Sequence, residues 1–255
     1  MGNAVIYEVE DRTARIALNE PAIHNALGQD LVVGLLGALE RAAGSDEVRV
    51  VVLTGVGPTF CAGLNLKGDF GGFVQKDDAP SPYQTLVKTF WDCPKPVIAR
   101  VQGSAFGAGF GLILCCDIAI AAAPAEFAVT ELHFGMPPTL IPLMLRHKQL
   151  LGALRPLLYT GERFGARRAL ELHVIHEIAE QATLDDAVSR CRDRLLRCAP
   201  EAFTAAKAIQ RSIGRMAFAE GLEFAAEELS RGLSSDEARE GFAAFAEKRR
   251  PKWAG

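Results

Sequence analysis

Two runs rich in β-branched residues, 49–54 and 97–102, constrain the fold of this chain most strongly. Both are too continuous for a half-exposed strand, so each predicts a strand that is buried on both faces of a sheet. A glycine-rich segment follows each run, and the second leads into the apolar stretch 108–116, which predicts a buried helix. Strands that alternate with helices in this way indicate an α/β fold.

The rest of the pattern extends this reading toward both ends. Residues 5–9 and 13–18 predict two antiparallel strands around a turn at 10–12. A helix follows, and its apolar face contains Leu31, Leu35, Leu39 and Ala42 and stops near Gly44. Further strands are predicted at 118–121, 126–129 and 174–178.

The C-terminal part of the sequence is predicted to be helical. From residue 184 onward we expect three or four amphipathic helices. One of them carries Phe218, Leu222, Ala225 and Leu229 on a single face. We therefore expect residues 1–190 to form a core that contains the ligand site, and residues 191–255 to form a helical region.

Composition narrows the class of partner. A chain of 255 residues, 49% of them hydrophobic, can bury a substantial core, and its net charge of -3 gives no general attraction to nucleic acid or to an anionic membrane. We expect a small-molecule partner. The six cysteines form no C-x-x-C pair and predict reduced thiols. No signal peptide is visible, so we expect a cytoplasmic protein.

The apolar run 103–116 is the one stretch that suggests a membrane segment. Its spacing of Gly103, Gly107 and Gly111 matches a repeated G-x-x-x-G pattern. The run is shorter than the roughly 17 to 25 residues that cross a bilayer, and Asp117 closes it. We interpret it as a buried helix of a protein without a membrane partner.

Residues 59–67 (TFCAGLNLK) and 103–109 (GSAFGAG) share one design. Each follows a buried strand, contains small residues and is expected to lead into a helix. Glycine allows close approach of a ligand, and a helix N-terminus presents unpaired N–H donors. Two such turns side by side can clamp one anionic oxygen. For either segment alone, tight packing is an equally good explanation.

The stretch 69–83 is rich in Gly, Asp and Pro and shows no period. It predicts a mobile loop near the first glycine segment, and such a loop is a candidate lid.

Nucleotide binding is the main competing interpretation of the glycines. In a dinucleotide-binding fingerprint that starts at Gly107 and Gly109, the third glycine should come one position after Gly111, and Asp117 is too close to act as the ribose-binding acid. No phosphate-binding P-loop pattern occurs in the chain. The sequence therefore favours an anion clamp without a nucleotide fold.

Four stretches, in this order, resemble the crotonase family, the enoyl-CoA hydratase/isomerase superfamily. They are 19–27 (NEPAIHNAL), 51–67 (VVLTGVGPTFCAGLNLK), 95–109 (KPVIARVQGSAFGAG) and 240–251 (EGFAAFAEKRRP). The resemblance covers nearly the whole chain. It implies an α/β spiral of ββα units with a C-terminal helical trimerisation region, a homotrimer or homohexamer, and an acyl-CoA thioester as substrate. Coenzyme A is then part of the substrate and no separate cofactor is expected.

The resemblance also implies site residues. In the family, two peptide N–H groups hold the thioester oxygen, and the motifs match them to Leu64 and Ala108. Family members bind the adenine along the segment that matches Ala62, Leu64, Asn65, Leu66 and Lys67. The C-terminal motif implies that Phe245 and Lys248 reach a coenzyme A molecule held by the neighbouring subunit.

The acids distinguish the possible reactions. Family hydratases use two carboxylates, but the position of the first is Gly111 here, and only the second is matched, by Glu131. Family isomerases use one glutamate at that position, some with an acidic residue where this chain has Asn65. Residues matching the aspartate of family hydrolases and the tyrosine of a decarboxylase are Thr139 and Pro138, which supports neither reaction.

Glu131 is one of 31 acidic residues, most of which are expected to be solvated. Its location after the apolar strand 127–129, near a predicted apolar pocket, favours a raised pKa and a role in proton transfer. We therefore expect an enoyl-CoA double-bond isomerase with one glutamate as acid and base. The alternatives are a hydratase-like enzyme, or an acyl-CoA-binding protein without turnover.

The histidines give only weak indications of a metal site or of a role in the pocket. His173 and His176 lie close together but lack a third ligand, so no metal site is expected. His133, two residues after Glu131, is within reach of the same pocket, although a structural role is the commoner explanation.

Overall fold

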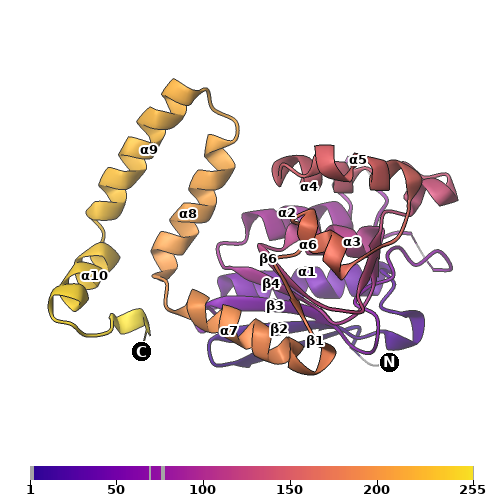
Figure 1. Ribbon diagram of the computed structural model, residues 1–255, viewed down its shortest axis with the longest axis horizontal. Helices are drawn as coiled ribbons and strands as arrows, with labels where there is room; N and C mark the ends of the chain where they lie inside the picture. Colours follow the sequence, from indigo (N-terminus) through magenta and orange to yellow (C-terminus); the bar gives the residue numbers. More distant parts are fainter. Residues whose placement is uncertain (1–2, 69, 76–77, 255) are drawn as a thin grey trace. The chain divides into compact units, whose positions relative to one another are not determined.

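A six-stranded sheet carries the first part of the chain, with the strand order β1-β2-β3-β4-β6-β9 (Figure 1). The computed structural model describes residues 3–68, 70–75 and 78–254. The strands are β1 (Val5–Glu10), β2 (Thr13–Leu18), β3 (Val50–Gly55), β4 (Val97–Val101), β6 (Ile118–Ala122) and β9 (Glu177–Ala179). β1 and β2 pair antiparallel, and every later pair is parallel.

A smaller sheet has the order β5-β7-β8. Its strands are β5 (Ala105–Phe106), β7 (Glu126–Ala128) and β8 (Phe164–Gly165). The chain passes from β4 of the large sheet to β5 of the small one and then into a helix, and from β6 to β7 in the same way. This succession places the ends of β4 and β6 next to short strands of the small sheet.

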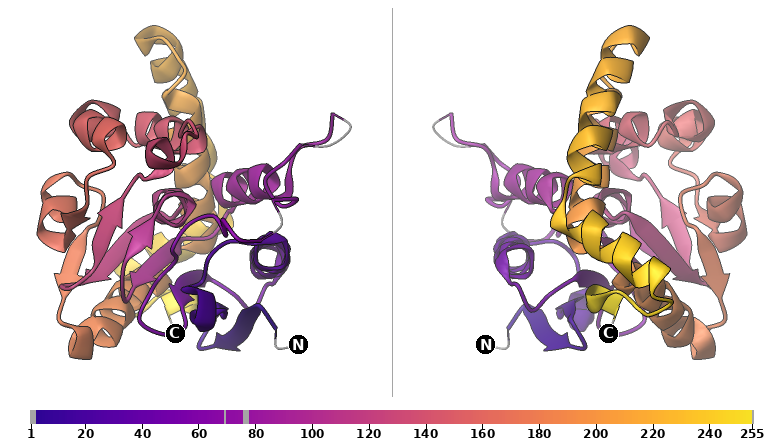
Figure 2. Two further views of the ribbon diagram at one scale, coloured as in Figure 1. Left: turned by 90° about the vertical axis from the view of Figure 1, so that its right-hand side faces the viewer. Right: turned by 90° about the vertical axis from the view of Figure 1, so that its left-hand side faces the viewer.

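Up to residue 196, the described residues form seven α-helices beside these sheets. They are α1 (Gln29–Gly44), α2 (Pro82–Asp92), α3 (Ala108–Cys115), α4 (Leu140–His147), α5 (Leu151–Thr160), α6 (Ala166–Glu171) and α7 (Leu184–Leu196). Figures 1 and 2 show α1, α2 and α3 on the same side of the large sheet. Single 3-10 turns occur at η1 (Pro21–Ile23), η2 (Glu131–Phe134) and η3 (Gln181–Thr183).

The core follows from the apolar pattern of these elements. All six residues of β3 are buried, as expected for a central parallel strand. The apolar stripe of α1 faces the sheet, whereas α3 is buried along almost its whole length. The rings of Phe110, Phe127 and Phe164 pack with centroids 5.7 to 6.2 Å apart and join α3 to the small sheet.

The chain divides into two compact units, residues 1–190 and residues 191–255. The second unit contains α8 (Pro200–Ile213), α9 (Phe218–Leu233), α10 (Asp236–Ala246) and the 3-10 turn η4 (Lys252–Ala254). Within this unit, the Glu237 carboxylate accepts hydrogen bonds of 2.9 Å from the N–H groups of Glu201 and Ala202 at the start of α8. Phe218, Leu222 and Leu229 on α9 are exposed in the single chain.

Most sequence expectations for the core are confirmed. The mixed α/β fold with ββα units and a helical C-terminal region is present, and the antiparallel start, α1, β3, β4 and α3 lie within a residue or two of their predicted positions. None of the six cysteines takes part in a disulfide bond. Within the described residues, the protein has no helix that is long and apolar enough to span a membrane.

Three expectations for local structure are wrong. The strand predicted at 174–178 begins only at Glu177 and ends at Ala179. Val174 N instead donates to Ala169 O and closes the turn after α6. No helix starts after the first glycine segment, where the described residues 64–68 form a turn. The predicted loop 69–83 ends earlier than expected, since Pro82 begins α2; residues 69, 76 and 77 of this predicted lid lie outside the described residues.

Candidate active site

The first glycine segment is held in place by the buried side chain of Asn25. Its Nδ2 donates to the carbonyl oxygens of Val56 at 3.0 Å and Thr59 at 2.8 Å, and its Oδ1 accepts from Glu20 N at 2.9 Å. Asn25 is fully buried, so these bonds are shielded from water. The loop that leads into residues 59–67 therefore has a fixed path.

A short parallel bridge then orients Leu64. Leu27 N donates to Gly63 O at 2.6 Å, and Asn65 N donates to Leu27 O at 3.0 Å. In a parallel bridge of this kind, the N–H of the residue between the two bonded peptides points to the opposite side. Gly63 has φ +94°, a conformation that favours glycine. The Leu64 N–H consequently points away from Leu27.

The second glycine segment lies directly beside the first. Phe106 N donates to Cys61 O at 3.0 Å, and Cys61 N donates to Ser104 O at 3.3 Å. Gly107, with φ 51° and ψ -125°, turns the chain into α3, whose first residue is Ala108. The N–H of a first helical residue has no partner within its own helix.

The two segments converge at Gly63 and Ala108. A Cβ atom placed on Gly63 would lie 3.5 Å from Ala108 N and only 2.7 Å from Phe106 O. Within the described part of the chain, neither Leu64 N nor Ala108 N donates to another group. Two unpaired N–H donors therefore occur where the two segments meet.

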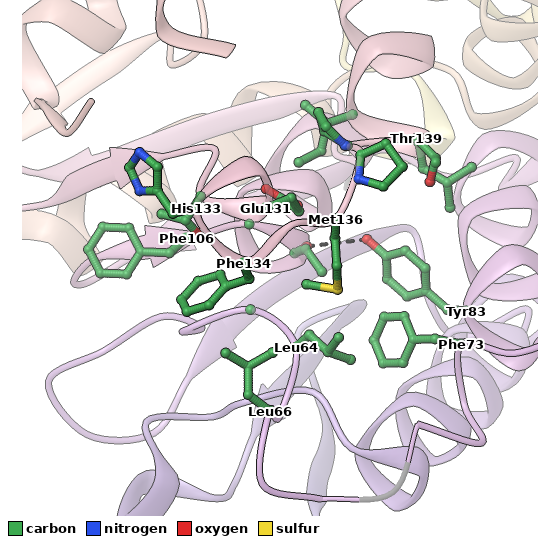
Figure 3. Close-up of a pocket in the computed structure, with 18 of the residues that line it drawn as sticks. Leu64, Leu66, Phe73, Tyr83, Phe106, Glu131, His133, Phe134, Met136 and Thr139 are labelled. Atoms are coloured by element: carbon green, nitrogen blue, oxygen red, sulfur yellow. Dashed lines mark hydrogen bonds between the residues drawn. The ribbon is translucent and has the colours of Figure 1, made fainter. Parts of the chain in front are cut away.

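These donors border a cavity of about 780 Å³. Figure 3 shows its apolar side chains together with Glu131, His133 and Tyr83. Apolar residues of the wall include Leu64, Leu66, Phe73, Phe106, Phe134 and Met136. Glu131 is the only acidic residue among the described residues that line the cavity.

Glu131 opens the 3-10 turn η2, directly after the small-sheet strand β7. Its Oε2 is the one buried side-chain polar atom without a hydrogen-bond partner among the described residues. Burial raises the pKa of Glu131 above its ordinary value, although the backbone N–H groups of Glu131 and Thr130 act in the opposite direction. An unpaired carboxyl with a raised pKa, on a cavity with two N–H donors, is suited to proton transfer next to a stabilised anion.

Comparison with known proteins agrees with this arrangement. Residues 8–255 match the enoyl-CoA hydratase/isomerase family. The chain belongs to this family. The resemblance to the crotonase superfamily seen in the sequence is thereby confirmed.

Individual members of the enoyl-CoA hydratase/isomerase family are similar to this chain over most of their length. A carnitinyl-CoA dehydratase from Citrobacter koseri is 36% identical over 216 residues, which cover 82% of each protein. One from Proteus mirabilis is 34% identical and covers 84% of this chain and 85% of its own. A solved enoyl-CoA hydratase/isomerase from Marinobacter aquaeolei has a TM-score of 0.89 and 31% identity, with 99% of both chains covered.

The space beside Gly111 is filled by a side chain from another helix. Gly111 lies in α3, and the hydroxyl of Tyr83 fills the space next to it: a Cβ atom at position 111 would lie 3.0 Å from Tyr83 Oη. The hydroxyl donates to Ala108 O at 3.3 Å, which the dashed line in Figure 3 marks. The sequence pattern predicts no role for Tyr83, which lies at the end of the predicted loop 69–83.

A local signal for Tyr83 was nevertheless present. Ser81 and Pro82 form a typical helix start, and the Ser81 side chain accepts from Gln84 N at 3.2 Å. The buried residues of α2 follow at helical spacing: Tyr83, Leu86, Val87 and Phe90. This pattern places the Tyr83 side chain on the inner face of α2.

Some of the site residues predicted from the sequence line the cavity, and others do not. Ala62, Leu64, Leu66, Ala108 and Glu131 line the cavity. Asn65 and Lys67 do not line it; the Asn65 side chain instead accepts from Lys67 N at 3.2 Å and shapes the turn. Phe245 and Lys248 belong to the second unit, where Phe245 is exposed.

The histidines have structural contacts. His133 lines the cavity, and its Nε2 lies 2.8 Å from Thr160 O. His176 Nδ1 accepts from Ala119 N at 3.0 Å, and burial lowers its pKa. Among the described residues, no group of three or more His, Cys, Asp or Glu side chains is arranged to hold a metal ion.

Proposed function

We propose that this family member binds an acyl-CoA thioester and moves protons at the carbon next to its carbonyl, and that the reaction is the migration of a double bond from C3 to C2 of an enoyl-CoA. The observation that carries the proposal is that Glu131 is the only acidic residue among the described residues lining the cavity. One carboxyl is sufficient for a proton shift, because the same group can take a proton and return it.

The chemistry uses three groups of the chain. The Glu131 carboxylate takes the proton from C2 of the 3-enoyl thioester, and the electron pair of that C–H bond delocalises onto the thioester oxygen. The N–H groups of Leu64 and Ala108 donate to this oxygen, where removal of one such donor typically costs about 2.7–4 kcal/mol. Glu131 then returns the proton at C4, and the thioester oxygen loses its charge as the double bond forms between C2 and C3.

Binding of the coenzyme A part rests on the family resemblance. We propose that the adenine lies along Ala62 to Lys67, and that Phe245 and Lys248 of a neighbouring copy of the chain contribute to the site. This arrangement requires a homotrimer or homohexamer. Light scattering would detect it, and a fully active monomer would contradict it.

A second candidate is the dehydration of a β-hydroxyacyl-CoA, favoured by the names of the relatives. Two carnitinyl-CoA dehydratases share 34–36% identity with the chain. The first step would be the same: Glu131 takes the C2 proton. The C3–O bond then breaks, and Glu131 gives this proton to the leaving hydroxide to form water. An acyl-CoA-binding protein without turnover is the third candidate.

The test is an assay of three thioesters with the wild type and Glu131→Gln. A 3-enoyl-CoA reports isomerisation, while a 2-enoyl-CoA and a β-hydroxyacyl-CoA report hydration and dehydration. We expect wild-type isomerisation that falls by about 10²–10⁴-fold in Glu131→Gln, the usual contribution of general acid–base catalysis. Glu40→Gln, on the exposed face of α1, is the matched control.

The other outcomes decide between the candidates. Turnover of only the hydratable or dehydratable substrates would favour the second candidate. Saturable binding without turnover of any thioester would favour the third. Isomerisation that survives in Glu131→Gln would remove Glu131 from the mechanism.

A further inference from the structure

The hydroxyl of Tyr83 and the missing side chain of Gly111 share one space. Tyr83 lines the cavity and is only 7% exposed. A Cβ atom on Gly111 would lie 3.0 Å from Tyr83 Oη and 3.6 Å from Ile141 Cγ1. A side chain at position 111 would therefore crowd the phenol, which would have to give way by a few tenths of an ångström. The two residues are complementary, and neither can be interpreted without the other.

The position of Tyr83 is fixed from its own side of the cavity. Its N–H donates to Gly72 O at 2.8 Å, and its ring packs on Phe73 with centroids 4.7 Å apart. The N-terminal cap of α2 by Ser81 holds the start of the same helix. The hydroxyl reaches α3 from this side of the cavity, and Figure 3 marks its bond with a dashed line.

The contact that it makes there is with Ala108. Tyr83 Oη donates to Ala108 O at 3.3 Å. Ala108 also carries one of the two unpaired N–H groups of the cavity. Its carbonyl and its N–H belong to neighbouring peptide planes at the start of α3. The plane with the N–H is held by Gly111 N, which donates to Gly107 O at 3.0 Å, and the Tyr83 hydroxyl adds a restraint on the next plane. A bond that holds the carbonyl limits the rotation of this turn and with it the direction of the N–H.

The protonation of Tyr83 differs from that of Glu131. Burial raises the pKa of Tyr83 well above its ordinary value, and the nearby Cys115, Cys61 and Glu131 raise it further. The phenol is thus a neutral hydrogen-bond donor at neutral pH. It supplies no second base to the cavity.

We propose that Tyr83 is a positioning residue for the reaction: its hydroxyl fills the place beside Gly111 and holds Ala108 so that the Ala108 N–H points at the thioester oxygen. This inference rests on the proposed function only in assigning that oxygen to the Ala108 N–H. It assigns a task to a residue of α2 that contacts neither the carboxyl nor the first glycine segment in any bond described above.

Tyr83→Phe tests the proposal, because it keeps the ring and removes only the hydroxyl. We expect kcat to fall about tenfold or more, since a small misplacement of a catalytic donor is costly, with KM within about twofold of wild type. Tyr159→Phe removes the same atom from an exposed tyrosine and should leave both constants unchanged. A Tyr83→Phe variant with wild-type kcat, or with a raised KM alone, would overturn the proposal.

Gly111→Ala supplies an independent variant. The added methyl group meets the Tyr83 hydroxyl and displaces it from Ala108, so kcat should fall as in Tyr83→Phe. In the double variant the hydroxyl is already absent, and the loss should be no larger than in Tyr83→Phe alone. Losses that multiply in the double variant would show two separate effects and contradict the shared role.

A spectroscopic measurement separates this inference from the proposed function. Butyryl-CoA labelled with ¹³C at the carbonyl has no double bond to move, so its infrared carbonyl stretch reports only the hydrogen bonds to the oxygen. We expect a lower frequency on the wild type than in water, and a shift back toward the water value on Tyr83→Phe. Circular dichroism confirms that each variant is folded.

The infrared outcomes are distinct. A wild-type shift that persists in Tyr83→Phe would overturn the positioning role and leave the two N–H donors and Glu131 in place. The absence of a shift on the wild type would overturn both the donor assignment and the role of Tyr83. A shift that depends on Tyr83, without turnover of any thioester, would support the positioning role and contradict the proposed reaction.

Discussion

The Glu131 carboxyl lies against Gly107, so that a Cβ atom at position 107 would stand 3.3 Å from Glu131 Oε1. Gly107 immediately precedes Ala108, the first residue of α3. Among the described residues that line the cavity, Glu131 is the only acidic one. Its carboxyl therefore lies beside the residue that precedes the unpaired N–H of Ala108. This arrangement allows a base and an anion-stabilising donor to act on adjacent atoms of one substrate.

The pH dependence of turnover should follow Glu131. Its pKa is raised above the ordinary value of 4.5, chiefly by burial, and the ionised form is the base. We expect kcat/KM to fall as the pH decreases through this raised pKa, with a slope of one proton. No basic limb is expected from Tyr83, whose pKa lies well above its ordinary value. A pH–rate profile with its acidic limb at or below pH 4.5 would contradict this assignment.

The same raised pKa predicts a pH-dependent effect on stability. A group whose pKa is higher in the folded than in the unfolded state contributes stability below the unfolded pKa and loses it as the pH rises through the folded one. Glu131→Gln does not titrate, so its Tm relative to wild type should increase from pH 4.5 toward pH 8. Thermal unfolding at several pH values checks this, with Glu40→Gln as control. A Tm difference independent of pH would show that Glu131 is not destabilised by ionisation.

Ala108→Pro should remove the Ala108 N–H donor and place the ring Cδ atom where its hydrogen pointed. Proline is favoured at the first position of a helix, and the preceding Gly107 has a conformation that glycine alone adopts easily. We expect the protein to fold and kcat to fall by about 10²–10³-fold, as for loss of one oxyanion donor. Ala108→Ser keeps the N–H and should retain most activity. Equal activity of the two variants would exclude the Ala108 N–H as a donor.

Asn25→Ala should destabilise the first glycine segment. The substitution removes the Asn25 donor from Val56 O and one of two donors from Thr59 O, which also accepts from Gln102 Nε2 at 2.9 Å. It also leaves Glu20 N without its acceptor, and the free energy of unfolding should decrease by about 2–4 kcal/mol. Asn19 is the control, because its amide makes an exposed hydrogen bond to Asn3 O. Asn19→Ala should change the free energy of unfolding by about 0.5 kcal/mol or less. Urea unfolding measures both. Similar losses in the two variants would contradict the role of Asn25.

The sequence predicted the parts of the fold that depend on local apolar pattern. Runs 49–54 and 97–102 became central strands because buried parallel strands need continuous apolar side chains, whatever their partners. The turn after Gly63 was different: its path depends on the bridge between Leu64 and Leu27, which are far apart in the chain. No local pattern contains that contact, so the expected helix start was wrong.

The candidate site was predictable to a similar extent. Glu131 and the two glycine segments were each identified from a motif whose own residues lie close together in the sequence. Tyr83 was missed because its partner Gly111 offers no side chain to suggest a contact, and because the Gly- and Pro-rich stretch before Ser81 obscured the start of α2. Complementarity between a large residue and a glycine is visible only in three dimensions.

The central claim is that Glu131 removes a proton from the carbon next to the thioester carbonyl. Turnover of a 3-enoyl-CoA or a β-hydroxyacyl-CoA in D₂O, followed by mass spectrometry and NMR, measures deuterium at C2 and C4. The proton on Glu131 exchanges with D₂O before its return in a fraction of turnovers, so we predict that the wild type introduces deuterium at C4 of the isomerised product and at C2 of recovered substrate. Glu131→Gln should introduce none above the uncatalysed level. Deuterium exchange at C2 that continues at the wild-type rate in Glu131→Gln would contradict the account.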